Sequence, residues 1–166
     1  MKFHLKFAQI KTKSEIECLV ELIREIWPEV FIPIIGEEQV DYMLVHYQGE
    51  AVIAAEIENG IRYFFIEDSD MLIGYFAYSL EEDNLAISKI YLKKSLRGFG
   101  LSSKVFSYLE EVAQENNKGK LSLRVNRSNK QAVEVYLRQG FEIVKIVDQP
   151  FGEKFFLNDY CMEKKI

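Results

Sequence analysis

One stretch of the chain, residues 87–106, constrains the fold more than any other: ISKIYLKKSLRGFGLSSKVF. Its apolar run ends at Leu92, and a basic turn with Arg97, Gly98 and Gly100 leads into a helical pattern. The first turn of a helix has unpaired backbone N–H groups at the positive end of the helix dipole. Glycines let a phosphate approach such a backbone closely. The stretch therefore predicts a site for a phosphorylated small molecule.

The composition fits one soluble globular domain. The chain has 166 residues, of which 48% are hydrophobic and 28% charged, as is usual for such proteins. A net charge of −5 argues against a nucleic-acid partner, because phosphate contacts need a basic surface. No apolar run approaches the roughly 18 residues of a membrane span, and the first residues do not resemble a signal peptide. A cytoplasmic protein without membrane contact is expected.

Cysteine and histidine chemistry is not indicated by the sequence. Cys18 and Cys161 are too far apart for a redox pair or a metal-binding motif. The only histidines are His4 and His46, so a histidine-rich zinc site is excluded. We expect two reduced, mostly buried cysteines and no metal ion.

Hydrophobic periodicity divides the chain into strands and helices. Ser14 and Glu17 fit a capping box at the start of a first helix. Pro28 is expected to end this helix, and the apolar stretch 28–36 is expected to be a loop. Residues 50–58 favour a short helix over a strand. The other expected elements are strands over 3–10, 61–67, 71–80, 84–92, 120–126, 141–147 and 155–163, and helices over 37–47, 101–115 and 129–139.

The order of these elements predicts a single α/β (α+β) domain over residues 1–166. Three consecutive strands from residue 61 to 92 are joined by polar linkers and should pair as antiparallel hairpins. Gly74, inside the second of them, indicates a bulge or a close backbone approach. A helix joins strands 84–92 and 120–126, which should therefore be parallel neighbours. The result is a mixed, mostly antiparallel twisted sheet of about six to seven strands with helices on both faces.

The glycine turn does not match either common nucleotide motif. No Lys-Ser or Lys-Thr follows Gly100, so the phosphate loop of nucleotide triphosphatases is absent. Ser103 stands where the third glycine of G-x-G-x-x-G belongs. Nucleotide hydrolysis and dinucleotide binding are therefore disfavoured.

A second motif follows downstream, in residues 126–141, which read NRSNKQAVEVYLRQGF. From Asn129 to Phe141 this segment has the pattern N-x-x-A-x-x-x-Y-x-x-x-G-F. Together with the turn that begins at Arg97, it resembles the acetyl-CoA motifs of the GCN5-related N-acetyltransferase (GNAT) family. The resemblance covers residues 61–163 well in element order and the preceding residues only in outline.

The resemblance implies how coenzyme A would be bound. Its pantetheine arm would pair with the end of a strand at Ile90, Tyr91 and Leu92, and Asn129 would form a hydrogen bond near that arm. The two parallel strands would be central and splayed, with the thioester between them. Backbone N–H groups of the turn would bind the pyrophosphate, at Arg97, Gly98, Phe99, Gly100, Leu101, Ser102 and Ser103.

The resemblance also implies direct transfer of the acetyl group from acetyl-CoA to a primary amine in a ternary complex. Tyr136 would protonate the departing thiolate. The acceptor is either a small-molecule amine, such as a polyamine or an aminoglycoside, or an amino group of a peptide or protein. Dimers are common in the family, so the resemblance is compatible with a homodimer. A cationic acceptor is mildly favoured by the acidic residues Glu29, Glu37, Glu38 and Asp41.

Two departures from the family pattern stand out. Ser102 occupies a position where the family usually has glycine or alanine, although serine is small and keeps its backbone N–H. The strand segment from Ala86 to Lys89 has no carboxylate, whereas many relatives place a glutamate base there. Deprotonation of the amine could use water held by Ser88, or Glu29 or Asp41. The alternative function is a catalytically quiet acyl-CoA-binding or sensor module with the same fold.

Overall fold

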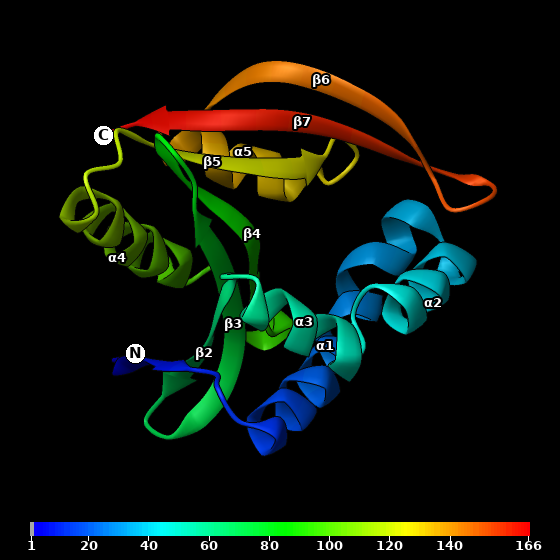
Figure 1. Ribbon diagram of the computed structural model, residues 1–166, viewed down its shortest axis with the longest axis horizontal. Helices are drawn as coiled ribbons and strands as arrows, with labels where there is room; N and C mark the ends of the chain where they lie inside the picture. Colours follow the sequence, from blue (N-terminus) through cyan, green and yellow to red (C-terminus); the bar gives the residue numbers. More distant parts are fainter. Residues whose placement is uncertain (1) are drawn as a thin grey trace. The chain divides into compact units, whose positions relative to one another are not determined.

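The computed structural model describes residues 2–166, which form a mixed α/β fold (Figure 1). The strands, in the sheet order β1-β2-β3-β4-β5-β7-β6, are β1 (Leu5–Gln9), β2 (Arg62–Asp68), β3 (Met71–Leu80), β4 (Asn84–Leu92), β5 (Lys120–Asn126), β6 (Glu142–Phe151) and β7 (Phe155–Lys165). The helices are α1 (Lys13–Ile35), α2 (Glu37–His46), α3 (Glu50–Glu58), α4 (Leu101–Glu115) and α5 (Lys130–Arg138), with a 3-10 turn η1 (Lys94–Leu96). Among these residues, no helix is both long and apolar enough to cross a membrane.

Two compact units divide the chain and share β4. The first consists of Met1–Ser79 and Lys89–Leu101, and the second of Leu80–Ser88 and Ser102–Ile166. The end of β4 therefore belongs to the first unit, whereas its start belongs to the second and pairs with β5. That pairing is parallel, as predicted, and it runs from Asn84 opposite Lys120 to Ile87 opposite Leu123.

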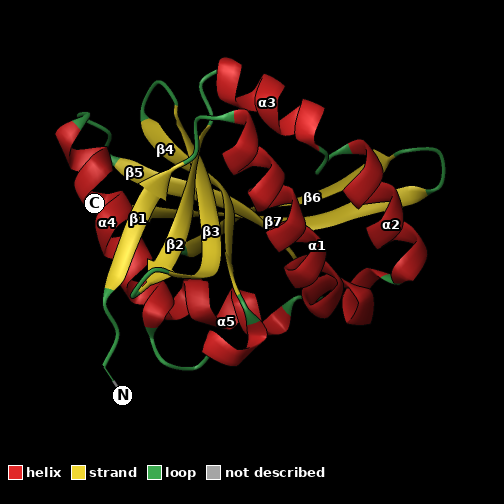
Figure 2. Ribbon diagram, turned by 90° about the horizontal axis from the view of Figure 1, so that it is seen from below, coloured by secondary structure: helices red, strands yellow, loops and turns green. Residues whose placement is uncertain are grey.

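The core of the first unit lies between α1 and the strands β2 and β3. Leu19, Ile23 and Ile26 on α1 are fully buried, and they belong to one cluster with Tyr63 and Tyr75. Figure 2 shows α1 beside these strands, with α3 next to it. Residues 50–58 form a helix, α3, as the sequence predicted, and not a strand.

Helix α1 is longer than the sequence predicted. The expectation that it ends at Pro28 with a loop behind it was wrong, because the helix continues past Pro33. A proline inside a helix removes a backbone hydrogen bond and costs about 3 kcal/mol. Beyond the first proline, however, Val30 and Phe31 still pack against the core that holds Trp27. Burial of these side chains offsets the cost of the two prolines.

The cap of α1 also lies earlier than predicted. Thr12 Oγ1 accepts a hydrogen bond from the Glu15 backbone N–H at 3.2 Å, and the Glu15 carboxylate accepts one from the Thr12 N–H at 2.9 Å. The bond from the Thr12 N–H to this carboxylate, with others from the Lys11 N–H and the Thr12 hydroxyl, lowers the pKa of Glu15. The capping box therefore consists of Thr12 and Glu15 rather than Ser14 and Glu17, a pair with the same spacing two residues later.

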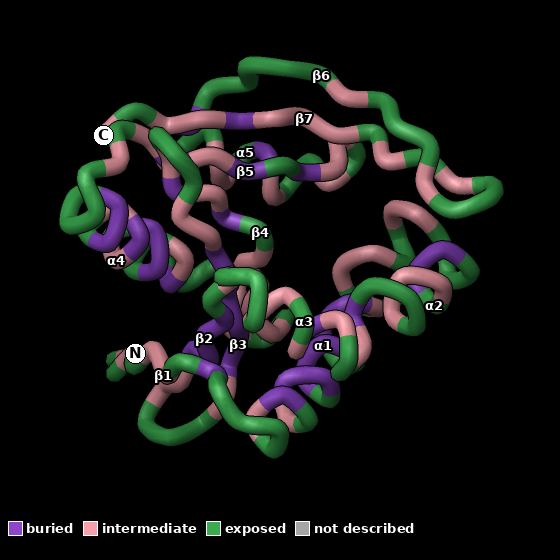
Figure 3. The backbone as a smooth tube through the Cα atoms, in the orientation of Figure 1, coloured by how far each residue is buried: buried purple, intermediate pink, exposed green. Residues whose placement is uncertain are grey.

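The second unit is built on β5, which pairs with β4 in parallel and with β7 in an antiparallel ladder. Val105 and Leu109 on helix α4 are buried, and Figure 3 shows buried and exposed stretches alternating along this helix. Helix α4 and strand β5 have the predicted bounds. The last two strands, β6 and β7, pair with each other and extend beyond the predicted 141–147 and 155–163.

Gly74 on β3 lies close to the end of β4 in the first unit. The register between β2 and β3 shifts beside it, so the predicted bulge is present. A Cβ at this position would collide with the backbone oxygen of Tyr91 and would lie 3.0 Å from a methyl carbon of Leu92. The backbone of Tyr91 has no room to move without disturbing the end of β4.

We expect Gly74→Ala to lower the free energy of unfolding by about 1–3 kcal/mol, the usual cost of overpacking. Chemical denaturation measures the change. The matched control is Gly119→Ala, because a Cβ at Gly119 meets nothing within 4 Å, and its effect should stay within about 0.5 kcal/mol. Equal stability of the two variants would contradict the close approach.

Candidate functional site

The basic turn after β4 is closed by contacts within the first unit. The Lys93 backbone N–H donates to the Ile73 carbonyl at 2.8 Å, which keeps the end of β4 beside β3. The Arg97 Nε then donates to the carbonyl of Leu92 at 3.1 Å. The bond between Arg97 and Leu92 joins the residues before and after η1. Together the two bonds hold the turn against the end of β4.

The two glycines of the turn adopt a conformation that other residues rarely reach. Gly98 has φ of 85° and Gly100 has φ of 74°, both in the left-handed region that favours glycine. Within residues 2–166, the backbone N–H groups of Gly98, Phe99 and Gly100 donate to no protein acceptor. Helix α4 begins directly afterwards at Leu101, so the positive end of its dipole follows the turn. This run of free donors suits a phosphate group.

The side chain of Arg97 is directed toward its own unit. Besides bonding to Leu92, its guanidinium lies 3.9 Å from a Glu29 carboxylate oxygen on α1. Burial lowers the pKa of Arg97, and the charge of Glu29 opposes this effect. The side chain thus closes the turn, and its backbone remains available for a ligand.

The remaining residues of the turn have different environments. The Phe99 ring is 48% exposed and lies 5.5 Å from the ring of Phe3. Leu101 is buried, so it anchors the first turn of α4. Ser103 Oγ accepts a hydrogen bond from Gln139 Nε2 at 2.7 Å. The start of α4 is therefore tied to the end of α5, a contact that the sequence did not reveal.

Asn129 and Tyr136 lie at the two ends of α5 in the second unit. Asn129 is the N-cap, and its side-chain oxygen accepts from the Ala132 backbone N–H at 3.4 Å. The Tyr136 ring packs edge-on against Phe106, with 5.9 Å between the ring centroids. Burial raises the pKa of Tyr136 to about 12. Its hydroxyl has no hydrogen-bond partner in the described chain and stays protonated at neutral pH.

The predicted site residues belong to both of the compact units. Ile90, Tyr91 and Leu92, at the end of β4, share the first unit with the turn up to Leu101. Ser102 and Ser103 open the helical part of the second unit, which also contains Asn129 and Tyr136.

An aromatic cluster beside the end of β4 was not predicted as a unit. The Trp27 ring lies 4.8 Å from Phe31 and 5.9 Å from Tyr91. The buried indole N–H of Trp27 donates to the Tyr75 hydroxyl at 2.7 Å. Lys89 Nζ lies 5.8 Å from the centre of the Trp27 ring. The signal in the sequence is a lysine, Lys89, directly before the apolar strand residues 90–92.

We expect Tyr75→Phe to cost about 1–3 kcal/mol of stability, because the buried Trp27 N–H loses the Tyr75 hydroxyl as its acceptor. Thermal and chemical denaturation measure this change. Tyr78→Phe, on the same strand, is the control, because the Tyr78 hydroxyl makes no hydrogen bond within the described residues. If the two variants are equally stable, the Trp27–Tyr75 bond contributes nothing.

A family model and a curated relative both identify the chain as similar to N-acetyltransferases. The model of the Acetyltransferase (GNAT) family matches residues 19–141, more than half of the chain. An uncharacterized N-acetyltransferase from the pepI 3' region of Lactobacillus delbrueckii subsp. lactis is 26% identical over 145 residues. That match covers 82% of this chain and 83% of the relative.

Solved structures share the fold at low sequence identity. The PaiA N-acetyltransferase of Thermoplasma acidophilum, solved in complex with coenzyme A, is 19% identical, with a TM-score of 0.81 and full coverage of both chains. The ribosomal-protein-S18-alanine N-acetyltransferase of Escherichia coli is 14% identical, with a TM-score of 0.72 and coverage of 98% of this chain and 94% of that one. These similarities establish the fold.

Proposed function

Because the chain belongs to the GNAT acetyltransferase family, we propose that it transfers the acetyl group of acetyl-CoA to a primary amine by direct attack in a ternary complex. The observation that carries the proposal is the turn before α4, with its left-handed glycines and free backbone N–H groups. Acetyl-CoA supplies the activated thioester when bound. The protein's residues bind it, orient it and supply protons.

The proposed pyrophosphate and pantetheine contacts run from the start of α4 back along β4. The N–H groups of the turn and of Ser102 and Ser103 hold the pyrophosphate at the start of α4. The backbone of β4 from Ile90 to Leu92, which follows the last residue pair with β5 at Ile87, pairs with the pantetheine arm. Asn129 contacts the coenzyme with the part of its amide that the helix cap leaves free. Ser102 suits pyrophosphate binding, because its side chain makes no hydrogen bond within the described residues.

Tyr136 is the proposed proton donor to the leaving thiolate. With its pKa raised to about 12, it is almost fully protonated throughout the neutral range. A free thiol has a pKa of about 8.5, but burial in an apolar site raises the pKa of a thiol as it raises that of a phenol. The two groups can therefore share the proton as the C–S bond breaks.

The proposed acceptor is a primary amine of a small molecule or of a peptide. The acidic residues that favoured a cationic acceptor are only partly available, because Glu29 lies beside Arg97. The same contact makes Glu29 a poor candidate for the base. Glu37 and Asp41 are exposed on α2 and remain candidates for attracting a cation.

A thiol-release assay over a panel of amines, with binding of acetyl-CoA measured by calorimetry, tests the proposal. We expect saturable binding and release of coenzyme A that depends on one class of amine. Binding without turnover on any amine would instead favour the quiet acyl-CoA-binding module, for which the missing carboxylate on β4 argues. Absence of binding would contradict both functions.

A further inference from the structure

Lys89 is the one lysine that lies inside the aromatic cluster of the first unit. It belongs to the end of β4, one residue before the segment proposed to pair with pantetheine. Its Nζ lies over the ring of Trp27, 5.8 Å from the ring centre. Trp27 in turn contacts Phe31 and Tyr91, so the amine lies against one ring of an aromatic cluster.

The charge of Lys89 has little compensation in this position. Within residues 2–166, the charge of Glu56 on α3 favours the protonated lysine, and Tyr63 on β2 donates a hydrogen bond to Glu56 at 2.8 Å. The other titratable groups around the cluster are Tyr75 and Tyr91, and burial keeps Tyr75 neutral by raising its pKa. Burial lowers the pKa of Lys89, while the charge of Glu56 opposes that shift. More of this lysine is therefore the free amine at neutral pH than of an exposed lysine.

The direction of the proposed coenzyme brings its reactive end to this amine. The pyrophosphate lies at the turn from Gly98 onward, and the pantetheine arm runs back along β4 from Leu92 to Ile90. The thioester follows the arm, so it arrives at the level of Lys89. When an amine with a lowered pKa is held next to a thioester, the two reactants of the transfer reaction are already positioned.

We propose that Lys89 is an internal acceptor, which takes the acetyl group from bound acetyl-CoA when no external amine is present. This inference rests on the proposed function. The Lys89 nitrogen lone pair attacks the thioester carbon, a C–N bond forms and the C–S bond breaks. The nitrogen loses one proton and the thiolate gains one, so the products are acetyl-lysine and the free thiol of coenzyme A. No oxidant or further reactant is needed.

The experiment incubates the purified protein with acetyl-CoA alone and follows acetylation of each lysine by mass spectrometry. We expect Lys89 to be modified at least about tenfold faster than the exposed Lys6, because a lowered pKa and proximity act together. The rate should saturate with acetyl-CoA, and excess coenzyme A should suppress it. Lys89→Arg should abolish the fast phase, whereas Lys6→Arg should leave it unchanged.

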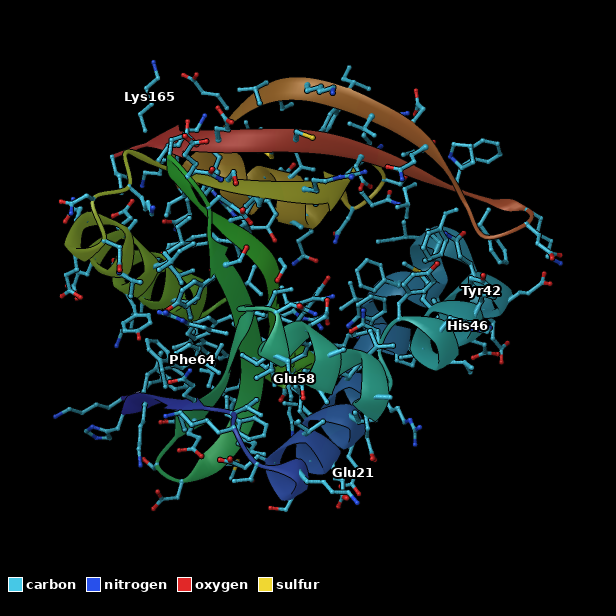
Figure 4. All side chains as sticks on the ribbon, viewed as in Figure 1. Glu21, Tyr42, His46, Glu58, Phe64 and Lys165 are labelled. Carbon is cyan, nitrogen blue, oxygen red and sulfur yellow. The ribbon has the colours of Figure 1, made fainter. Side chains whose placement is uncertain are left out.

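Two variants on α3 test the protonation state. Glu56→Gln keeps an acceptor for Tyr63 but removes the charge that holds the proton on Lys89, so acetylation should become several-fold faster. Glu58→Gln, at the exposed end of the same helix (Figure 4), should have no effect. An unchanged rate in Glu56→Gln would contradict attack by the neutral amine.

Calorimetry with coenzyme A separates the two levels of the inference. If coenzyme A binds saturably but Lys89 reacts no faster than Lys6, the internal acceptor is overturned and the proposed function stands. If coenzyme A does not bind, the proposed function fails, and the internal acceptor fails with it.

Discussion

Gly100→Asp should weaken the binding of acetyl-CoA about a hundredfold. The substitution puts a carboxylate beside the proposed pyrophosphate, and two like charges about 4 Å apart repel by about 4 kcal/mol near a protein surface. A loss of about 2.7 kcal/mol of binding free energy, which is less than this repulsion, raises the dissociation constant a hundredfold. A Cβ at Gly100 meets no protein atom within 4 Å, so the variant places its carboxylate without a clash at the first side-chain atom. Calorimetry with acetyl-CoA measures it.

The backbone conformation supplies the control for this variant. Gly100 has positive φ, which is strained for aspartate, and Gly60 has φ of 98° with equally open surroundings. Gly60→Asp should therefore lose similar stability but keep its affinity for acetyl-CoA. Unchanged affinity in Gly100→Asp would place the pyrophosphate elsewhere.

The sequence predicted those parts of the fold in which local signals and tertiary packing agree. Helix α4 and strand β5 have an unbroken apolar period with clear stops, and their bounds match. The end of α1 was mispredicted because the prolines at 28 and 33 are strong local breakers. The burial of Val30 and Phe31, which overrides them, depends on the strands they meet and is not visible in the local sequence.

The site could be predicted from the sequence only as far as its motifs reach. The turn glycines and the cap at Asn129 have local signatures, and the structure gives both the conformations that those signatures require. The bonds from Arg97 to Leu92 and from Gln139 to Ser103 have no such signature. Neither does the placement of Lys89 beside Trp27, because the two residues are far apart in the chain and meet only after α1 packs on the sheet.

Tyr136→Phe should lower turnover by up to about a hundredfold and leave the affinity for acetyl-CoA nearly unchanged. The ring would still pack edge-on against Phe106, so the variant removes little more than the hydroxyl. Steady-state rates with the best amine of the panel, together with calorimetry, measure the two effects. The buried Tyr78→Phe should retain full activity.

The pH dependence of the wild-type rate adds a test of the same role. Because the folded-state pKa of Tyr136 is raised to about 12, the phenol keeps its proton from pH 6 to 9 and contributes no descending limb there. The rate should instead rise with pH as the acceptor amine loses its proton. A rate in Tyr136→Phe equal to that of the wild type at every pH would show that water or another group protonates the thiolate. A slow variant with the same rising profile would assign the lost step to the leaving group, because the amine would still enter deprotonated.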